Sequence, residues 1–413
     1  MALHIRLLLA LAAGMALGAV LSPLAPGTWI EWANLHVLRP VGQLFLRGIL
    51  MVVVPLVVSA LVVAVHDLGR RRDLGGVAGR TLALTLGLSA VSVSIGLLLV
   101  NLVAPGDGIG AIATASDSVS ALSAHAAATK ALPDILVELV PRNPVEAAVR
   151  ALDGDMLALM VAAIVFGLAI SRVAVDPDGA PPVLITVLDQ VSTASMQIVR
   201  WLMQWSPYAV FAIVFGTALT FGTSLIRPLA LYVTTVVLAL ALQQFVVYGL
   251  TLRLLAGRSP GAVFRQCRSV YAYAFSTASS NATLPLSIET AEQRLGVPRH
   301  IARFVLTVGA TANQNGTALF EGVTVVFLAQ AYGLDLTFGQ EIRVMVMSVV
   351  AGIGTAGVPG GSLPMVLLVA QSVGVPAEGM ALVLGVDRFL DMCRSAVNVS
   401  GDLVVATVVS RHA

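Results

Sequence analysis

Long apolar runs separated by short polar stretches occupy most of the chain. A helix needs roughly 20 residues to cross the hydrocarbon core of a bilayer, and many of the runs reach or approach that length. Eight of them are expected to form membrane helices: Ile5–Leu24, Val37–Val65, Leu82–Val103, Met156–Ile170, Val191–Thr220, Ala230–Leu254, Ile301–Tyr332 and Gly379–Val409. The pattern therefore predicts an all-α polytopic membrane protein.

The composition agrees with this prediction. Hydrophobic residues make up 57% of the chain and charged residues 11%, compared with about a quarter charged in soluble domains. A formal net charge of +2 offers no basic surface for nucleic acid. Cys267 and Cys393 lie beside or within membrane segments, so neither a disulfide framework nor a redox role is expected.

Arginines predict the orientation. Two groups flank the expected spans, one between the second and third and one after the sixth: Arg70, Arg71, Arg72 and Arg80, then Arg253, Arg258, Arg265 and Arg268. By the positive-inside rule both groups face the cytoplasm. This predicts a multi-pass protein of the inner (cytoplasmic) membrane with both termini cytoplasmic, whose first apolar run is kept as a span and not cleaved as a signal peptide.

Two further apolar segments are interrupted. Val270–Ala291 contains the serine-rich stretch 276–281, and Val344–Val373 contains the glycine-rich stretch 352–361. Such backbone is tolerated at membrane depth only where it is buried in protein or lines a cavity. We therefore expect each segment to fold back as a re-entrant helical hairpin.

The two hairpins belong to an internal repeat. Each break is followed by a similar tripeptide, Thr283-Leu284-Pro285 or Ser362-Leu363-Pro364, and then by a helix with an Asn-x-x-Gly motif. Hairpins that enter from opposite faces would bring their tips together near the midplane. There, exposed N–H groups would suit an anion and unwound carbonyls a cation, as in inverted-repeat transporters.

One polar stripe lies within the last apolar run. At helical pitch its members fall within an arc of roughly 80°: Asp387, Asp391, Arg394, Asn398 and Asp402. Each charge costs about 2.5 to 3.5 kcal/mol at the centre of a membrane helix. A polar site for a charged solute is the favoured interpretation, and structural ion pairs that lock helices together are the alternative.

These motifs together resemble the dicarboxylate/amino acid:cation symporter family, which includes archaeal aspartate transporters and vertebrate glutamate transporters. The resemblance covers essentially the whole chain and rests on the serine-rich first hairpin, the Asn-Gln-Asn-Gly-Thr motif at 313–317, the Gly-Thr-Ala-Gly-Val-Pro-Gly tip at 354–360, and the stripe. It implies eight transmembrane helices, two re-entrant hairpins, inverted repeats and an elevator mechanism. It also implies a homotrimer, in which residues 1–258 mainly form the trimerisation scaffold, the third and sixth spans excepted, and residues 259–413 form the core transport domain.

The resemblance also implies a substrate. Arg394 would bind the side-chain carboxylate of an acidic amino acid, because its planar fork suits bidentate binding, and Asp391 would accept the ammonium. Asp387 would support them. The remaining positions of the implied pocket are Ser280, Thr317, Val358, Gly361, Ser395 and Asn398. Having both Asp391 and Arg394 predicts uptake of aspartate or glutamate, with a C4-dicarboxylate as the alternative substrate.

Coupling to Na⁺, H⁺ or both is implied in the same way, and no other cofactor is expected. One cation site would use Gly309, Asn313, Asn398 and Asp402, and another would use Thr311, Gly352, Ile353 and Thr355. A third looks degraded, because Asn315 replaces a carboxylate and Leu88-Ser89 replaces a Thr-Ser pair, with Thr85 at the place of a tyrosine. Glu321 aligns with the proton-carrying glutamate of vertebrate members; the alternative is a structural glutamate bonded to a neighbour. The arginine that relatives keep in the first hairpin or the last span is missing at Ala278 and Met392.

Two other classes fit less well. An intramembrane hydrolase would need a nucleophile and a base, but no histidine falls in the middle of a span, and Gly360-Gly361-Ser362 does not extend to Gly-x-Ser-x-Gly. An anion channel could also use broken helices. A stripe of mixed charge suits a binding pocket better than a pore ring.

Overall fold

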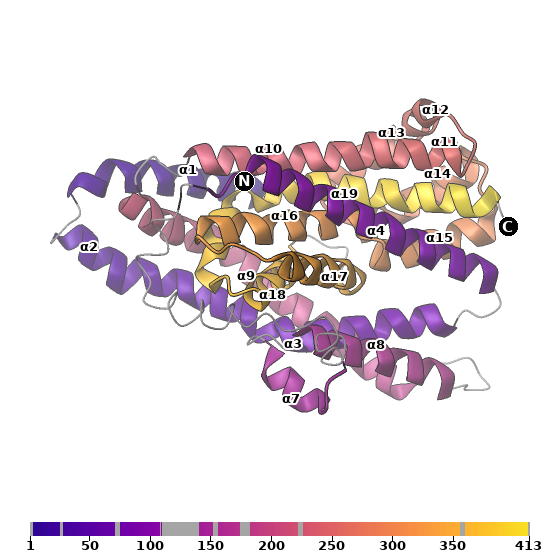
Figure 1. Cartoon of the computed structure of the whole chain (residues 1–413), viewed down its shortest axis with the longest axis horizontal. Coiled ribbons are helices and arrows are strands. Elements are labelled where there is room, and N and C mark those ends of the chain that lie inside the picture. Colours follow the sequence, from indigo (N-terminus) through magenta and orange to yellow (C-terminus); the bar gives the residue numbers. More distant parts are fainter. Residues whose placement is uncertain are drawn as a thin grey trace.

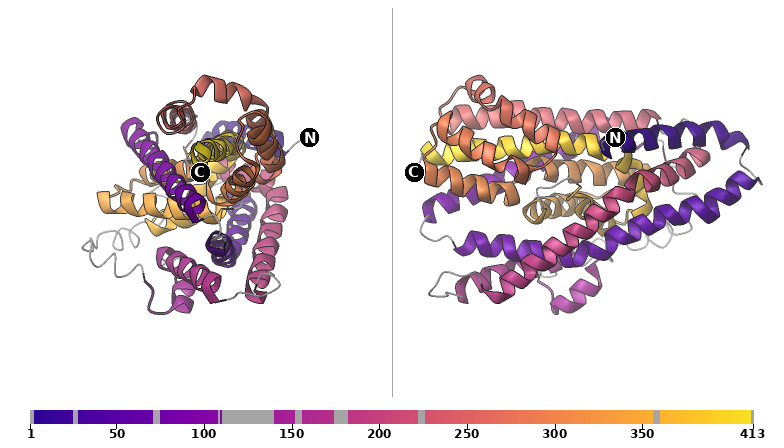
Figure 2. Two further views of the ribbon diagram at one scale, coloured as in Figure 1. Left: turned by 90° about the vertical axis from the view of Figure 1, so that its right-hand side faces the viewer. Right: turned by 180° about the vertical axis from the view of Figure 1, so that it is seen from behind.

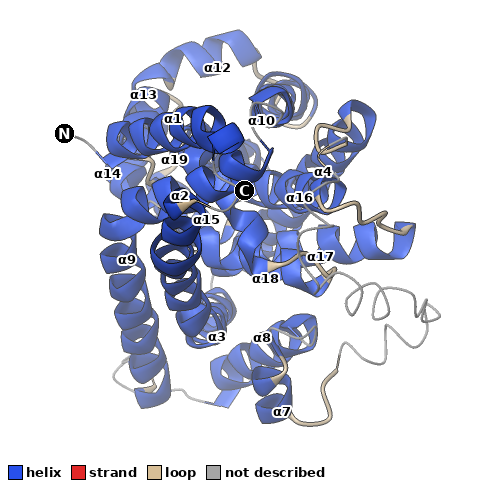
Figure 3. Ribbon diagram, turned by 90° about the vertical axis from the view of Figure 1, so that its left-hand side faces the viewer, coloured by secondary structure: helices blue, strands red, loops and turns tan. Residues whose placement is uncertain are grey.

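The computed structural model describes residues 3–24, 28–70, 75–107, 109, 140–151, 156–173, 182–221, 226–355 and 360–411. Within these ranges the chain forms helices joined by turns, and no strand is present (Figure 3). Val358, one of the predicted pocket residues, lies outside them. The predicted all-α class is confirmed.

The first part of the chain contains long helices and a few short ones. In chain order they are α1 (Leu3–Leu21), α2 (Trp29–Ala33), α3 (Arg39–Arg70), α4 (Gly75–Val103), α7 (Pro144–Val149), α8 (Met156–Val173), α9 (Val183–Phe221), α10 (Ile226–Ala241) and α11 (Tyr248–Leu254). Single π-helical turns, Asn34–Leu38 and Leu242–Val247, join α2 to α3 and α10 to α11. At each π-helical turn the helix continues without a break but is locally wound more loosely.

The second part is made of shorter helices until the last one. It contains α12 (Pro260–Gln266), α13 (Arg268–Thr277), α14 (Ser280–Gln293), α15 (Arg299–Ala312), α16 (Asn315–Ala331), α17 (Phe338–Gly354), α18 (Leu363–Ser372) and α19 (Met380–Arg411). The breaks between them place polar residues and free helix ends inside the protein.

The protein is a membrane protein by the length and apolar character of its helices. Among the described residues, four stretches suffice to cross a bilayer singly: Trp29–Val63, Gly76–Val103, Ile226–Leu254 and Leu382–Arg411. A fifth is formed if Val183–Leu202 and Gln204–Leu219, which meet at 54°, count as one span. The count of eight spans and two re-entrant hairpins remains a prediction.

The helix pairs at the two predicted breaks are compact. Between α13 and α14, Ala278 takes the left-handed conformation with φ of 49°, and the Ser279 hydroxyl caps α14 by accepting from the Ala282 N–H at 3.2 Å. At the start of α18, Gly360 has φ of 75°, which glycine adopts without steric cost. The arms of each pair pack against one another.

One expected span differs from the prediction. The run Ile301–Tyr332 was predicted to be a single helix, but α15 ends at Ala312 and α16 begins at Asn315. Asn398 on α19 supplies the reason, because its Oδ1 accepts from the N–H groups of Gly316 at 2.7 Å and Thr317 at 3.2 Å. A helix start buried in protein needs such a cap for its free N–H groups.

Two groups of helices are distinguished by their packing (Figures 1 and 2). Helices α3 and α9 pack along each other, α1 packs on α9, and α8 packs on α3, whereas α4 lies along α16, and α10 contacts α4, α16 and α19. The best enclosed is α19. Its apolar window is 83% buried, against 33% to 47% for the other long apolar helices, so its charged stripe faces protein.

Candidate substrate and cation site

The two turns and the break before α16 meet at α19. They line a partly open cavity with about 230 Å³ of empty space, its open side included, and its walls are mostly polar: Ala278, Ser280, Gln314, Thr317, Thr355, Ser362, Asp391, Arg394, Ser395 and Asn398. Residues more than 100 positions apart in the chain thus line one small space. Of the predicted substrate residues, Gly361 does not line this cavity and lies buried in the adjoining turn.

Arg394 is the most deeply buried cation of the site, with 1% of its surface exposed. Its Nε donates to Asp391 Oδ1 at 3.1 Å, and its Nη2 lies 3.2 Å from Asp387 Oδ1. The guanidinium also stacks over the Phe320 ring, 4.1 Å from the centroid. These contacts hold the planar group in one orientation.

The ion pairs of Arg394 lie within α19. Asp387, Asp391 and Arg394 all belong to that helix, so their pairing cannot lock two helices together. This argues against the structural alternative for the stripe. Beyond α19, Asp391 Oδ2 accepts from the Gly360 N–H at 3.1 Å, and the Arg394 guanidinium stacks on Phe320 of α16.

Several polar atoms around the cavity lack a hydrogen bond. They are Nη1 and Nη2 of Arg394 and the hydroxyls of Ser280 and Ser362. Nη2 is close to Asp387, but the geometry of that ion pair is not that of a hydrogen bond. Buried polar atoms without partners are costly, and here they converge on a space that can hold a ligand with oxygens.

Asn398 is fully engaged within the protein. Besides capping α16, its Nδ2 donates to Thr317 Oγ1 at 2.9 Å and to Gln314 Oε1. Gln314 in turn accepts from the Thr317 hydroxyl at 3.3 Å. Asn398 therefore already joins α19 to α16, and any substrate or cation that binds to it must share its side chain with these hydrogen bonds.

A candidate cation site lies where α15 approaches α19. Asn313 Nδ2 donates to Asp402 Oδ1 at 2.8 Å, while Asn313 Oδ1 is buried without a partner. Gly309 packs directly on the Asp402 carboxylate, and a Cβ there would collide with it. Carboxylate, amide and backbone oxygens are the ligands of hard cations such as Na⁺, so this oxygen set fits one.

The residues of the second predicted cation set lie at the ends of two helices. Gly352 and Ile353 belong to the last turn of α17, and the Gly352 backbone lies near Gln314. The Thr355 hydroxyl donates to the Ala351 carbonyl at 2.8 Å and lines the substrate cavity. The backbone of Thr311 belongs to the last turn of α15.

Glu321 is buried on α16 with neither carboxyl oxygen in a hydrogen bond. The expected alternative, a glutamate bonded to a neighbour, does not match this environment. Arg394 is the charged group that acts on it electrostatically. An ionised carboxylate in such a place is expensive, which favours a group that carries a proton.

Asn315 lies in a second buried polar cluster, in which both polar atoms of its side chain have hydrogen-bond partners. Its Oδ1 accepts from the Ser89 hydroxyl at 2.6 Å, its Nδ2 donates to Tyr248 Oη at 3.0 Å, and its carbonyl accepts from Ser92 at 2.9 Å. Leu88 and Thr85 are buried on the same helix as Ser89. The Asn315 amide therefore takes part in a protein network and carries no charge that would attract a cation.

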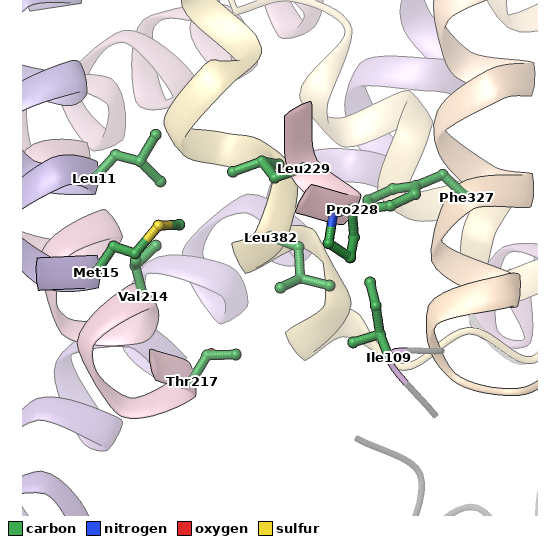
Figure 4. Close-up of a pocket in the computed structure, with 9 residues that line it drawn as sticks. All are labelled: Leu11, Met15, Ile109, Val214, Thr217, Pro228, Leu229, Phe327 and Leu382. Atoms are coloured by element: carbon green, nitrogen blue, oxygen red, sulfur yellow. The ribbon is translucent and has the colours of Figure 1, made fainter. Parts of the chain in front are cut away.

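A larger cavity, about 350 Å³, lies elsewhere and is apolar. Figure 4 shows its lining side chains: Leu11, Met15, Ile109, Val214, Thr217, Pro228, Leu229, Phe327 and Leu382. Its one hydroxyl, on Thr217, donates to the Ile213 carbonyl at 2.8 Å. The cavity therefore offers nothing to a charged solute, and the smaller polar cavity is the candidate site.

The sequence did not single out Arg388, Gln314 or Ser362. Arg388 Nη1 lies 3.4 Å from Asp391 Oδ2, and its i, i+3 spacing from Asp391 was a signal that could have found it. Gln314 and Ser362 line the cavity because of the break and the turn at which they sit. The signal for Ser362 was its place in the repeated tripeptide.

Known proteins resemble this chain over nearly its whole length. A proton/glutamate-aspartate symporter of Escherichia coli K12 is 33% identical over 410 residues, which cover 98% of this chain and 92% of the relative. A proton/sodium-glutamate symport protein of Bacillus subtilis 168 is 33% identical over 376 residues, 91% of this chain and 86% of the relative. A C4-dicarboxylate transport protein of Rhodospirillum rubrum is 29% identical over 412 residues, 99% and 88%.

The family assignment rests on the chain as a whole. Residues 3–412 match the sequence profile of the sodium:dicarboxylate symporter family, a family of transporters and not of enzymes. The profile thus takes in the interrupted helices, the polar cavity and the charged stripe together. The chain belongs to the sodium:dicarboxylate symporter family.

Proposed function

We propose that this protein is a secondary active symporter that takes up an acidic amino acid, aspartate or glutamate, together with protons, sodium ions or both. The observation that carries the proposal is the pairing of Arg394 and Asp391 at one polar cavity, where Nη1 of the guanidinium has no partner and Nη2 has only the ion pair with Asp387 at 3.2 Å. The planar guanidinium can bind a carboxylate of the substrate. The names of the E. coli and B. subtilis relatives point the same way.

The other residues take roles consistent with their surroundings. Asp391 would accept the substrate ammonium, and the free hydroxyls of Ser280 and Ser362 would bind its second carboxylate. Ser395 and Thr317 complete the wall. Asn313 and Asp402 would hold a sodium ion, and Glu321 would carry a proton.

Transport would follow an elevator movement. Helices α1, α3, α8 and α9 pack mainly on one another and would form the static scaffold of a homotrimer. Helices α4 and α10 pack on α16 and α19 and would move with residues 259–413. By the positive-inside rule, the arginine-rich loops support an orientation in which both termini would lie on the cytoplasmic side of the inner membrane.

Uptake by proteoliposomes tests the proposal. Labelled aspartate is offered under an inward sodium gradient, an inward proton gradient, or neither. Accumulation that requires one of the gradients supports the proposal, whereas gradient-independent equilibration contradicts symport. Labelled succinate, offered in parallel, tests the alternative of a C4-dicarboxylate carrier, which the R. rubrum relative favours, and single-channel recording tests an anion channel.

A further inference from the structure

Asp391 accepts hydrogen bonds from three donors, two on its own helix α19 and one in the turn before α18. Its Oδ1 accepts from Arg394 Nε at 3.1 Å, and its Oδ2 accepts from the Gly360 N–H at 3.1 Å and from Arg388 Nη1 at 3.4 Å. The Arg388 side chain is 15% exposed and the Asp391 side chain 7%. A pair so enclosed is weakly screened by water.

Arg388 changes the charge of the site. Without it, the buried charges beside the cavity are the carboxylates of Asp387 and Asp391 and the single guanidinium of Arg394. With it, two carboxylates face two guanidinium groups, since Arg388 also acts electrostatically on Asp387. Its Nε is buried without a hydrogen-bond partner, so the group is not saturated by its contact with Asp391.

We infer that Arg388 sets the preference of this pocket between substrates with an ammonium group and dicarboxylates without one, by competing with the ammonium for the Asp391 carboxylate. The inference rests on the proposed acidic amino acid site. Arg388 acts through Asp391 and is therefore a positioning residue. Arg388 would reduce the binding free energy that a substrate gains from its ammonium group and increase the binding free energy that it gains from a carboxylate.

Aspartate and succinate isolate this effect, because succinate is aspartate with a hydrogen in place of the ammonium. Two unit charges about 6 Å apart at an effective dielectric constant of about 20 interact strongly enough for a change on the order of 100-fold. Because Arg388 is partly exposed, water screens this interaction, and we expect the relative affinity for the two substrates to change about tenfold. The sign is definite: removing Arg388 should favour aspartate over succinate.

The experiment measures the ratio of the succinate inhibition constant to the aspartate half-saturation constant in proteoliposomes. Arg388→Met should raise this ratio about tenfold, and Arg388→Lys should keep it within about threefold of the wild type. Arg303→Met is the matched control. Arg303 forms an ion pair with Glu292, with 3.6 Å between the two charged groups, and it does not line the cavity, so this variant should leave the ratio unchanged. A ratio for Arg388→Met within about twofold of the wild type, or lower, overturns the inference.

A further variant and a further measurement keep the test decisive. If Arg388→Met yields no folded protein, Arg388→Gln removes the same charge and is held to the same tenfold expectation. If succinate competes too weakly to measure, labelled succinate and labelled aspartate are offered separately, and Arg388→Met should lower the uptake efficiency for succinate relative to aspartate about tenfold; an unchanged relative efficiency overturns the inference. Failure of the wild-type protein to transport aspartate at all would instead refute the proposed function.

Discussion

Two buried polar clusters meet on the first turn of α16 and differ in how completely they are bonded. Each polar atom of the Asn315 side chain has a partner, in Ser89 or Tyr248, and its carbonyl accepts from Ser92, whereas the cavity lined by Thr317 contains unpaired hydroxyl and guanidinium atoms. Positions two apart on a helix point about 200° apart, so the clusters occupy opposite sides of this turn. The open cluster is suited to a ligand, and the closed cluster contributes to the stability of the fold.

The largest effect on transport is expected when the guanidinium of Arg394, the cation of the open cluster, is removed. Arg394→Cys should lower the affinity for aspartate by about 100- to 5000-fold, because a buried substrate carboxylate would lose its partner at a cost of about 3 to 5 kcal/mol. Competition by small neutral amino acids should appear in the same variant. Unchanged aspartate affinity, measured by uptake, would contradict the pocket.

Removing the carboxylate of the open cluster should separate two substrate classes. Asp391→Ser should weaken aspartate by about 10- to 100-fold, the range of a hydrogen bond to a charged group, and weaken succinate far less. The effect is opposite in direction to that of Arg388→Met. Equal losses for both substrates would show that Asp391 does not recognise the amine.

A substitution of Glu321 tests whether this unpaired carboxyl group carries the coupled proton without taking part in substrate binding. Glu321→Gln should reduce uptake driven by a proton gradient about tenfold or more, since an amide cannot take up and release a proton. Substrate binding, followed by exchange of labelled aspartate at equal concentrations across the membrane, should persist. A wild-type protein driven by sodium alone would mean that Glu321 is structural.

The smallest effect on transport is expected in the closed cluster. Ser89→Ala leaves Asn315 Oδ1 buried without a donor, which should lower the stability by about 1 to 3 kcal/mol. Thermal unfolding in detergent should show a lower melting temperature, while the half-saturation constant for aspartate stays within about twofold. Ser94→Ala is the control, because Ser94 is exposed on the same helix and bonds to the Ala90 carbonyl of its own turn. A loss of sodium dependence in Ser89→Ala would show that the closed cluster binds an ion after all.

The sequence predicted those parts of the site that depend on local pattern. The stripe on α19 follows from helical spacing alone, and the turn at Ala278 follows from a run of small polar residues in an apolar segment. The break before α16 was not predicted. Asn313, Gln314 and Asn315 interrupt the apolar run there, but the cap of the helix comes from Asn398, 82 residues away from Gly316, a contact that no local pattern contains.

Arg388 was missed for a different reason. It follows Asp387 directly, so it points about 100° away from the start of the stripe, and a search for residues on one face passes over it. Its long side chain reaches back to Asp391. Length and flexibility of a side chain thus decide contacts that the backbone periodicity does not contain.

The Asn398 amide has a consequence for the order of events during loading. Its single oxygen holds the N–H groups of Gly316 and Thr317, and an ion that draws on this oxygen must compete with both. When an ion occupies the site, the hydrogen bonds of the first turn of α16 to Asn398 should weaken, and when the ion leaves they should form again. Amide hydrogen exchange at Gly316 and Thr317 would therefore act as a built-in reporter of ion occupancy, without any label on the substrate.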